Sequence, residues 1–247
     1  MADFYFNGQK FDHELVAAIS SRLDSVGVPN ILWDNYLLTV YGVPTIVDSI
    51  AFVIPDKLLT VAYSALLNTG FLPCALGTGC IYSSMRYRPT PSSHLHITEE
   101  RVVSLYQKSQ TLLIFPDFDE ILHDAGNPYI MHASDSQLPS ACPGRGAGRF
   151  PSSLYPVRIP TAIKYCEAVI HLLCRDRGSA HESYWIVLLT YIMEYVDGTS
   201  IFNEEALAQP YQRLYHAIKH GDLKMYLILD EIRYELMGLT NDPAAEK

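Results

Sequence analysis

The sequence predicts an α+β protein with a mixed sheet in its N-terminal half and a helical C-terminal half. In the first half, short runs rich in β-branched residues alternate with helical patterns. In the second half, apolar residues recur three and four positions apart over long segments. Nearly half of the 247 residues are apolar, so the chain can bury a sizeable core. We expect a single domain over residues 1–247, with an α/β part (1–130) covered by a helical part (155–238).

Local patterns define the elements of the α/β part. The first helix has apolar residues at helical spacing and ends where Gly27 and Pro29 interrupt it. Asp34 and Asp56 precede two further helical runs, and aspartate is a residue type that caps helix N-termini. Runs of β-branched or alternating residues predict the strands. In chain order, the expected elements are a helix (11–26), a strand (30–33), a helix (34–41), a central strand (44–54), a helix (57–68) and strands at 71–75 and 94–97.

After residue 97 the patterns change in character. Thr98 to Arg101 can open a short helix with an acidic first turn, and Thr111 to Phe115 fits either a strand or a short apolar turn. Residues 134–153 are dense in Ser, Pro and Gly, and this composition predicts a long surface loop. The polar tail, 240–247, is expected to fray. The expected helices of the second half lie at 160–174, 183–196, 204–220 and 223–236.

Composition and charge narrow the classes of function. The formal net charge of −9 repels phosphate backbones, so nucleic acid is not an expected partner. No apolar run reaches the roughly 20 residues that span a bilayer, and the N-terminus lacks a signal-peptide pattern. The five cysteines form no Cys-x-x-Cys pair, which favours a reducing compartment. We expect a cytoplasmic protein without a membrane segment, and the sequence leaves its oligomeric state open.

The most informative segment runs from Trp33 to Gly70. Its order is strand, helix, strand and helix, with a Tyr-Gly-Val-Pro-Thr run (41–45) before the second strand. This order resembles the opening of the nucleotidyltransferase superfamily. In that family a glycine pair opens the first helix, and the second strand carries an Asp-x-Asp whose carboxylates hold the catalytic metals. The chain is also similar to a large group of fungal proteins that share this strand and a Gly-Arg-Gly-x-Gly-Arg loop.

The resemblance implies a nucleotidyltransferase-like topology without the family's metal chemistry. Trp33-Asp34 stands where the glycine pair is expected, and Ser49 and Ala51 stand where the two carboxylates are expected. Two divalent ions a few ångströms apart need carboxylate oxygens, which serine and alanine do not supply. Asp48 is adjacent, but neighbours on a strand point to opposite faces. The resemblance therefore indicates a degenerate Asp-x-Asp, as in a pseudoenzyme.

Three hypotheses of function follow. The first is a catalytically degenerate nucleotidyltransferase-like protein that binds a small anionic molecule or a partner in the cleft between sheet and helical half. The second is a divergent, metal-independent transferase of fungal specialised metabolism, and the third is a structural interaction protein. If the cleft performs chemistry, Asp48, His96 and Asp117 are the candidate catalytic residues. No motif names a cofactor, and we expect none.

The loop at 144–150 is the candidate for anion recognition. Its glycines let backbone N–H groups approach an anion closely, and Arg145 and Arg149 can clamp a phosphate or carboxylate. Arg158 follows nearby in the sequence, and Trp33 completes the expected ligand-binding set. The alternative is a flexible solvent loop whose arginines pair with surface carboxylates.

A histidine pair is the remaining candidate. His94 and His96 are two positions apart on an expected strand and therefore share one face, a geometry that two metal ligands can adopt. Two ligands do not make a site, and no spacing selects the groups that would complete it. We therefore assign no metal ligands from the sequence, and the alternative is a polar pair that lines a groove. The candidate completing groups are His123, His132, Asp117 and Asp119.

Overall fold

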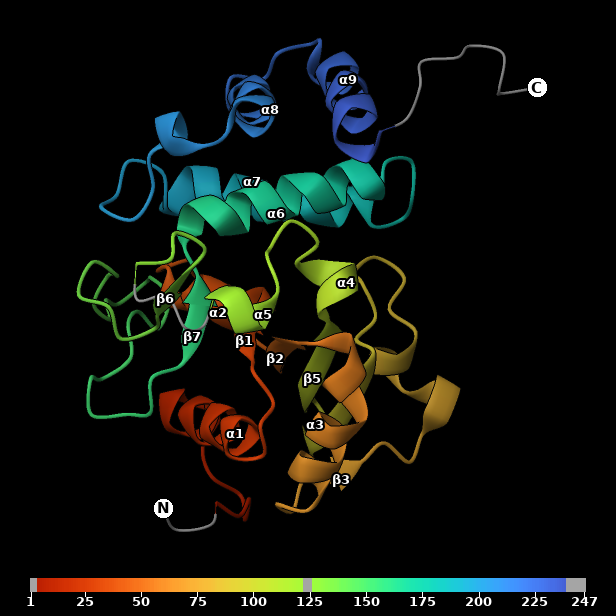
Figure 1. Cartoon of the computed structure of the whole chain (residues 1–247), viewed down its shortest axis with the longest axis vertical. Coiled ribbons are helices and arrows are strands. Elements are labelled where there is room, and N and C mark those ends of the chain that lie inside the picture. Colours follow the sequence, from red (N-terminus) through yellow and green to blue (C-terminus); the bar gives the residue numbers. More distant parts are fainter. Residues whose placement is uncertain (1–3, 122–125, 239–247) are drawn as a thin grey trace. The chain divides into compact units, whose positions relative to one another are not determined.

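The structure, a computed structural model, describes residues 4–121 and 126–238. It divides into two compact units, drawn together in Figure 1. The boundary between them falls close to the predicted start of the helical part. The expectations of one domain and of a helical half that covers the sheet stay predictions. The N-terminal unit comprises residues 1–85 and 89–162, and the C-terminal unit comprises residues 86–88 and 163–247.

Among the described residues, the N-terminal unit is built on a mixed five-stranded sheet with the order β1-β2-β5-β4-β3. β2 and β5 run parallel, and the other neighbouring pairs are antiparallel. This mixed sheet, together with helices in both units, confirms the predicted α+β class. The strands are β1 (Ile31–Trp33), β2 (Ser49–Ile54), β3 (Leu72–Pro73), β4 (Ser93–Thr98) and β5 (Arg101–Gln107).

β2 is a central strand, since all 6 of its residues are buried. Its β-branched and aromatic side chains suit a sheet that is covered on both faces. Ser49 is the polar exception, and its hydroxyl donates a hydrogen bond to the Ser104 hydroxyl on β5 at 2.7 Å. Both serines are buried, so each hydroxyl finds in the other the hydrogen-bond partner that water cannot provide.

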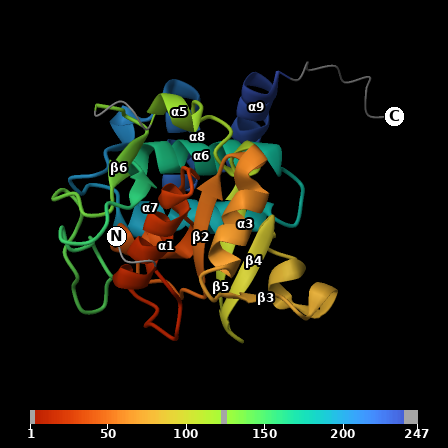
Figure 2. The same ribbon diagram turned by 60° about the horizontal axis from the view of Figure 1, so that its bottom comes forward.

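Three longer helices belong to the N-terminal unit. α1 (His13–Ser25) begins after Asp12, whose carboxylate accepts hydrogen bonds from two backbone N–H groups of the first turn. α3 (Leu59–Leu67) packs beside α1, and Figure 2 shows both helices in front of the strands. α2 (Asp34–Val40) contacts β1 and β2. The shorter helices are α4 (Lys108–Thr111) and α5 (Phe118–Ile121).

A second, two-stranded sheet consists of β6 (Ile130–His132) and β7 (Arg158–Pro160). β7 lies beside β1. Arg158 donates two hydrogen bonds to Asp24 near the end of α1, at 3.0 and 2.8 Å. The Tyr155 hydroxyl donates another to the same carboxylate at 2.7 Å. This sheet was not predicted, because its two strands are far apart in sequence and each has only 3 residues.

The C-terminal unit is helical, as predicted. Arg177 links its helices, because it contacts Glu182 at the start of α7 and Asp230 in α9, both at 2.9 Å. α8 packs beside α9. No helix within the described residues is long and apolar enough to cross a membrane. The helices are α6 (Ala162–Arg175), α7 (Glu182–Tyr195), α8 (Gln209–Lys219) and α9 (Met225–Met237).

The structure corrects the start of one strand and rejects one expected helix. The central strand, expected over 44–54, begins only at Ser49, and the carbonyl of Ile46 accepts from the Asn35 side chain instead of joining a strand ladder. The helix expected at 98–101 is wrong. A tight turn joins β4 to β5 there, and β5 is buried from Val102 to Tyr106.

Two further local predictions need correction. The strand alternative for Thr111 to Phe115 is wrong, because this segment turns after α4 and buries Leu112 and Phe115. Asp56 does not cap α3. It lies in a single 3-10 turn, and its carboxylate accepts from the backbone N–H of Ser109 at 3.1 Å. The tail at 240–247 lies outside the described residues.

The predicted long loop folds back on the C-terminal end of α2. The N–H of Gly146 donates to the carbonyl of Gly42 at 3.0 Å, and the N–H of Gly148 donates to that of Thr39 at 2.9 Å. These bonds satisfy carbonyls that the end of a helix leaves open. A Cβ on Gly146 would lie 2.7 Å from the Val43 carbonyl oxygen and closer still to that of Thr39. Only glycine fits at this position.

We expect Gly146→Ala to lower the free energy of unfolding by about 1–3 kcal/mol, because the added methyl group meets rigid backbone. Chemical denaturation of the purified proteins measures this change. Gly79→Ala is the matched control, since a Cβ there meets nothing within 4 Å. Equal stability of the two variants would contradict the close packing of the loop on α2.

Candidate metal centre

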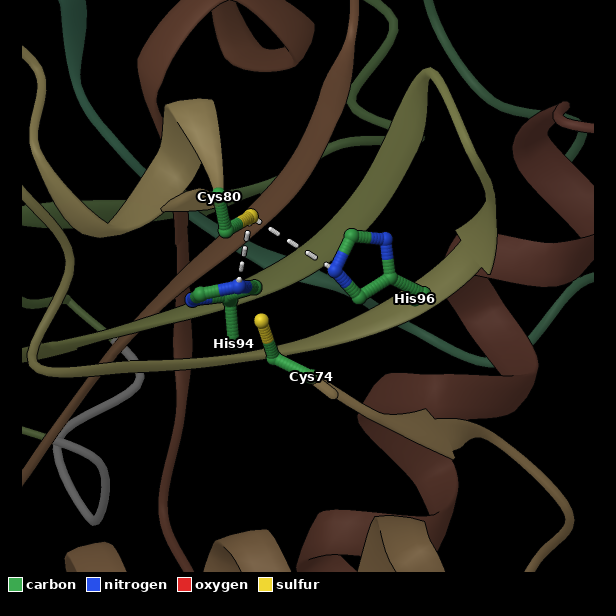
Figure 3. A group of neighbouring side chains, drawn as sticks. All are labelled: Cys74, Cys80, His94 and His96. Carbon is green, nitrogen blue, oxygen red and sulfur yellow. Dashed lines mark hydrogen bonds between the residues drawn. The ribbon is translucent and has the colours of Figure 1, made fainter. Parts of the chain in front are cut away.

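Four side chains with metal-ligand chemistry converge at one edge of the N-terminal sheet. They are Cys74, Cys80, His94 and His96, and Figure 3 shows them pointing toward a common point. One ligand atom from each lies within 4.8 Å of all the others. Within residues 4–121 and 126–238, no other group of three or more His, Cys, Asp or Glu side chains comes together in this way.

The local structure explains why these residues meet. His94 and His96 lie on the same face of β4, because side chains two apart on a strand point the same way. β3 pairs antiparallel with β4, with Pro73 opposite Leu95, so the next position along β3 brings Cys74 toward His94. Cys80 lies between two 3-10 turns, Gly77–Gly79 and Ile81–Ser83, which return the chain to the histidines.

Two of the distances between these atoms agree with a tetrahedral site. The sulfur of Cys80 lies 3.4 Å from Nε2 of His94 and 3.7 Å from Nε2 of His96. Zinc lies about 2.3 Å from thiolate sulfur and about 2.0–2.1 Å from imidazole nitrogen, so sulfur and nitrogen ligands of one tetrahedral ion are about 3.6 Å apart. Both distances match this value without movement of the chain.

A hydrogen bond behind the site orients one histidine. Nδ1 of His96 lies 3.2 Å from the carbonyl oxygen of Thr98, which can only accept, so Nδ1 carries the proton and donates. Nε2 of this ring is then left with its lone pair toward the cluster. A metal-binding histidine usually has such a partner on its second nitrogen, since that bond fixes the tautomer and the ring orientation.

The protonation states favour metal binding. Burial raises the pKa of the Cys74 thiol, but hydrogen-bonding contacts with His96, with the backbone at Leu76 and Gly77 and with Cys80 outweigh it and lower that pKa to about 7. Burial, followed by the neighbouring charge of His96, lowers the pKa of His94. A thiolate and a neutral imidazole are the forms that bind metal, so both shifts act in the same direction.

An apolar shell surrounds the site. Cys80 forms a buried cluster with Tyr82 and Val102, and Met85 packs against this cluster. The Tyr82 ring lies 5.9 Å from the ring of His94, and its hydroxyl donates to the carbonyl of Glu100 at 2.6 Å. This packing holds Cys80 and His94, the two buried ligands, in place.

The donor set restricts the chemistry of the site. Two sulfur and two imidazole ligands suit zinc or a similar soft ion, whereas magnesium and calcium prefer oxygen ligands. Four protein ligands fill a tetrahedral shell, so no coordination position remains for a reacting water. The arrangement therefore fits a structural metal.

The structure does not bring the predicted catalytic residues together. His96 belongs to the metal cluster, but Asp48 directly precedes β2 and Asp117 lies near the other end of that strand. Asp117 and Asp56 both line a cavity of about 560 Å³, and the ammonium group of Lys108 lies 3.5 Å from the Asp117 carboxylate. A strand of the length of β2 spans about 20 Å, so the two aspartates cannot act on one substrate atom.

The predicted ligand-binding residues have partners within the fold. Arg158 binds the Asp24 carboxylate, and the Arg149 guanidinium donates to the carbonyls of Ser136 and Leu138 at 3.4 and 3.0 Å. Trp33 is buried on β1, opposite Ala51. Arg145 is exposed on the loop. The loop's glycine N–H groups bond α2, so they do not form an open cradle for an anion.

Sequence reasoning found the histidines but not the cysteines. The sequence suggested other groups to complete the site. Of these, His132, Asp117 and Asp119 do not join the cluster, and His123 lies outside the described residues. The available signal was Cys74-x5-Cys80 followed by His94-x-His96, two close pairs of ligand types in one short stretch. A search restricted to Cys-x-x-Cys spacing passes over this pattern.

Comparisons with known proteins assign no family. No protein-family model matches the chain, and no curated protein matches it. A similar solved structure is the solution structure of the antibiotic-resistance factor ANT(2'')-Ia, described as revealing substrate-regulated conformation dynamics. The two chains are 11% identical, the match covers 88% of this chain and 94% of that chain, and the TM-score is 0.34. A likeness this distant assigns neither a family nor an activity to this chain.

Proposed function

We propose that the N-terminal unit binds one zinc ion through Cys74, Cys80, His94 and His96, and that this ion stabilises the fold. The observation that carries the proposal is the convergence of the four ligand atoms within 4.8 Å of one another. Because the set is complete without water, the ion's role is structural.

The segment that supplies the cysteines contains little regular structure, and few of its side chains are buried, chiefly Cys80 and Tyr82. β3 contains 2 residues and lies at the sheet edge, and the two turns that follow contain 3 residues each. Three of its large apolar side chains are mostly exposed, Leu72 at 63%, Leu76 at 66% and Ile81 at 67%. Because these three side chains stay in water, the segment gains less from the hydrophobic effect than a fully packed segment would. A metal would supply the missing stabilisation, as it does in small metal-dependent folds.

The hypothesis of a nucleotidyltransferase-like protein with a degenerate metal site stays a second proposal, because one observation favours it. Asp34 opens α2 with φ 63°, a left-handed conformation that glycine adopts most readily. The resemblance expects a glycine pair at this point. Ser49 and Ala51 are buried in β2, where neither offers a carboxylate to a metal. Binding of an anionic ligand through Arg145 remains part of this proposal.

Purified protein should contain about one zinc ion per chain, measured by elemental analysis, because four ligands are preorganised. Replacement of zinc by cobalt should give the strong visible absorption of a tetrahedral thiolate site. Cys80→Ser should lose the metal and this absorption. Cys142→Ser is the control, since Cys142 is exposed and outside the cluster, and it should keep both. Loss of metal in both variants, or in neither, would refute the assignment.

Removal of the metal should lower stability. A ligand that binds only the folded state at 100 times its dissociation constant adds about 2.7 kcal/mol, so a chelator should lower the free energy of unfolding by at least about that amount. Urea denaturation with and without chelator measures the effect. The Cys80→Ser variant should not respond to chelator. A wild-type protein with equal stability under both conditions would show that the site does not hold a structural ion.

The second proposal predicts no metal-dependent nucleotidyl transfer. Wild-type protein incubated with labelled ATP, CTP, GTP or UTP and magnesium should give no incorporation, because Ser49 and Ala51 cannot hold the ions. A known nucleotidyltransferase assayed in parallel serves as the positive control. Robust magnesium-dependent incorporation would overturn this proposal and would make Asp48 the first residue to substitute.

A further inference from the structure

A cavity of about 440 Å³ lies in the N-terminal unit and shares no residue with the metal centre. It lies between the start of α1, the helix α2 and the long loop at 134–153. Its volume falls in the range of small-molecule sites, about 300–1,000 Å³. The residues that define it are Phe11, His13, Tyr36, Val47, Ala147 and Leu154.

The walls of this cavity are mainly aromatic and aliphatic. The ring of His13 is stacked on Phe150 at 4.0 Å and meets Tyr36 edge-on at 6.1 Å. Phe11 also contacts Tyr36, with ring centroids 5.8 Å apart. Aromatic rings prefer such stacked and edge-to-face neighbours, so a further ring would find favourable geometry in this cavity.

One polar atom of the lining has no partner. Nε2 of His13 is buried and makes no hydrogen bond, although buried polar atoms in proteins are nearly always paired. Burial lowers the pKa of this ring, against the opposing charge of Asp12, so the ring is neutral near pH 7. A neutral histidine that lacks a partner can form one more hydrogen bond with a molecule in the cavity.

The charges at the cavity select against anions. Asp12 and Glu14 line it, and neither lysine nor arginine is among its lining residues. A carboxylate or phosphate would therefore meet like charge in the lining. Arg101 lies over the Phe11 ring, 4.8 Å from its centroid, but is not among the lining residues. The loop that resembles an anion clamp in sequence contributes the methyl group of Ala147 to the wall instead.

We propose that this cavity binds a small, neutral aromatic molecule that carries one hydrogen-bonding group. The ring lies against Phe11, Tyr36 and His13, and its polar group pairs with Nε2 of His13. The site is independent of zinc binding, so the metal experiments and this one fail separately.

Indole and benzoate are matched probes, since both are small aromatic molecules and only benzoate is charged. Titrated into the zinc-containing wild-type protein and followed by NMR, indole should bind saturably to one site and benzoate should not. Resonances of residues that line the cavity should shift. No saturable indole binding, or equal binding of benzoate, would overturn the proposal.

Two variants locate the site. His13→Phe keeps a ring but removes Nε2, and it should weaken indole binding about fivefold, the loss expected for one hydrogen bond of about 1 kcal/mol. Ala147→Trp should abolish binding, because it fills the cavity from an exposed loop position. His132→Phe is the control, since His132 is exposed and does not line the cavity.

Circular dichroism checks that each variant is folded before its titration. Unchanged indole affinity in folded Ala147→Trp would show that indole binds elsewhere. Unchanged affinity in His13→Phe would refute the hydrogen bond on which the assignment of the ligand class depends.

Discussion

The N-terminal unit depends on β2, a strand buried along its whole length and hydrogen-bonded to a neighbour on each side. β5 pairs with β2, β4 pairs with β5, and β3 pairs with β4, so the histidines take their positions from a ladder that begins at β2. The hydrogen bond between Ser49 and Ser104 helps to fix this register, because a slip of one residue would send each hydroxyl to the opposite face. The metal ligands lie at the edge of the sheet, where such support is weakest.

Local patterns were sufficient for most of the helices and for β1, β2, β3 and β4. Helical periodicity and terminal glycines are properties of adjacent residues, and they hold whatever the rest of the chain does. β5 was missed because it follows Glu99-Glu100, and two acidic residues also suit the first turn of a helix. Only the pairing of Val102 and its neighbours with β2 and β4 decides between the two. β6 and β7 stabilise each other across the whole long loop, which no local pattern encodes.

Two of the four ligands of the candidate metal centre, the histidines, could be predicted from the sequence. His94 and His96 lie on a regular strand, where sequence spacing fixes the face to which a side chain points. Cys74 and Cys80 lie on turns without a period, so their meeting with the histidines is a result of the fold. The aspartates chosen by residue type lie at opposite ends of β2. The loop at 144–150 shows a related limit, since the backbone N–H groups that glycines expose can bind a helix end as well as an anion.

The end of α2 has a consequence for the order in which the protein is made. Its carbonyls at Thr39 and Gly42 are satisfied by Gly148 and Gly146, and the Tyr41 hydroxyl donates to the carbonyl of Pro160, 119 residues later. At ribosomal rates of about 5–20 residues per second, roughly 6 to 24 seconds pass between the synthesis of Tyr41 and that of Pro160. During that time the Thr39 carbonyl has only local partners, such as the N–H of Gly42 at 3.1 Å. The contacts between β7 and β1 can therefore form only after Pro160 has been synthesised.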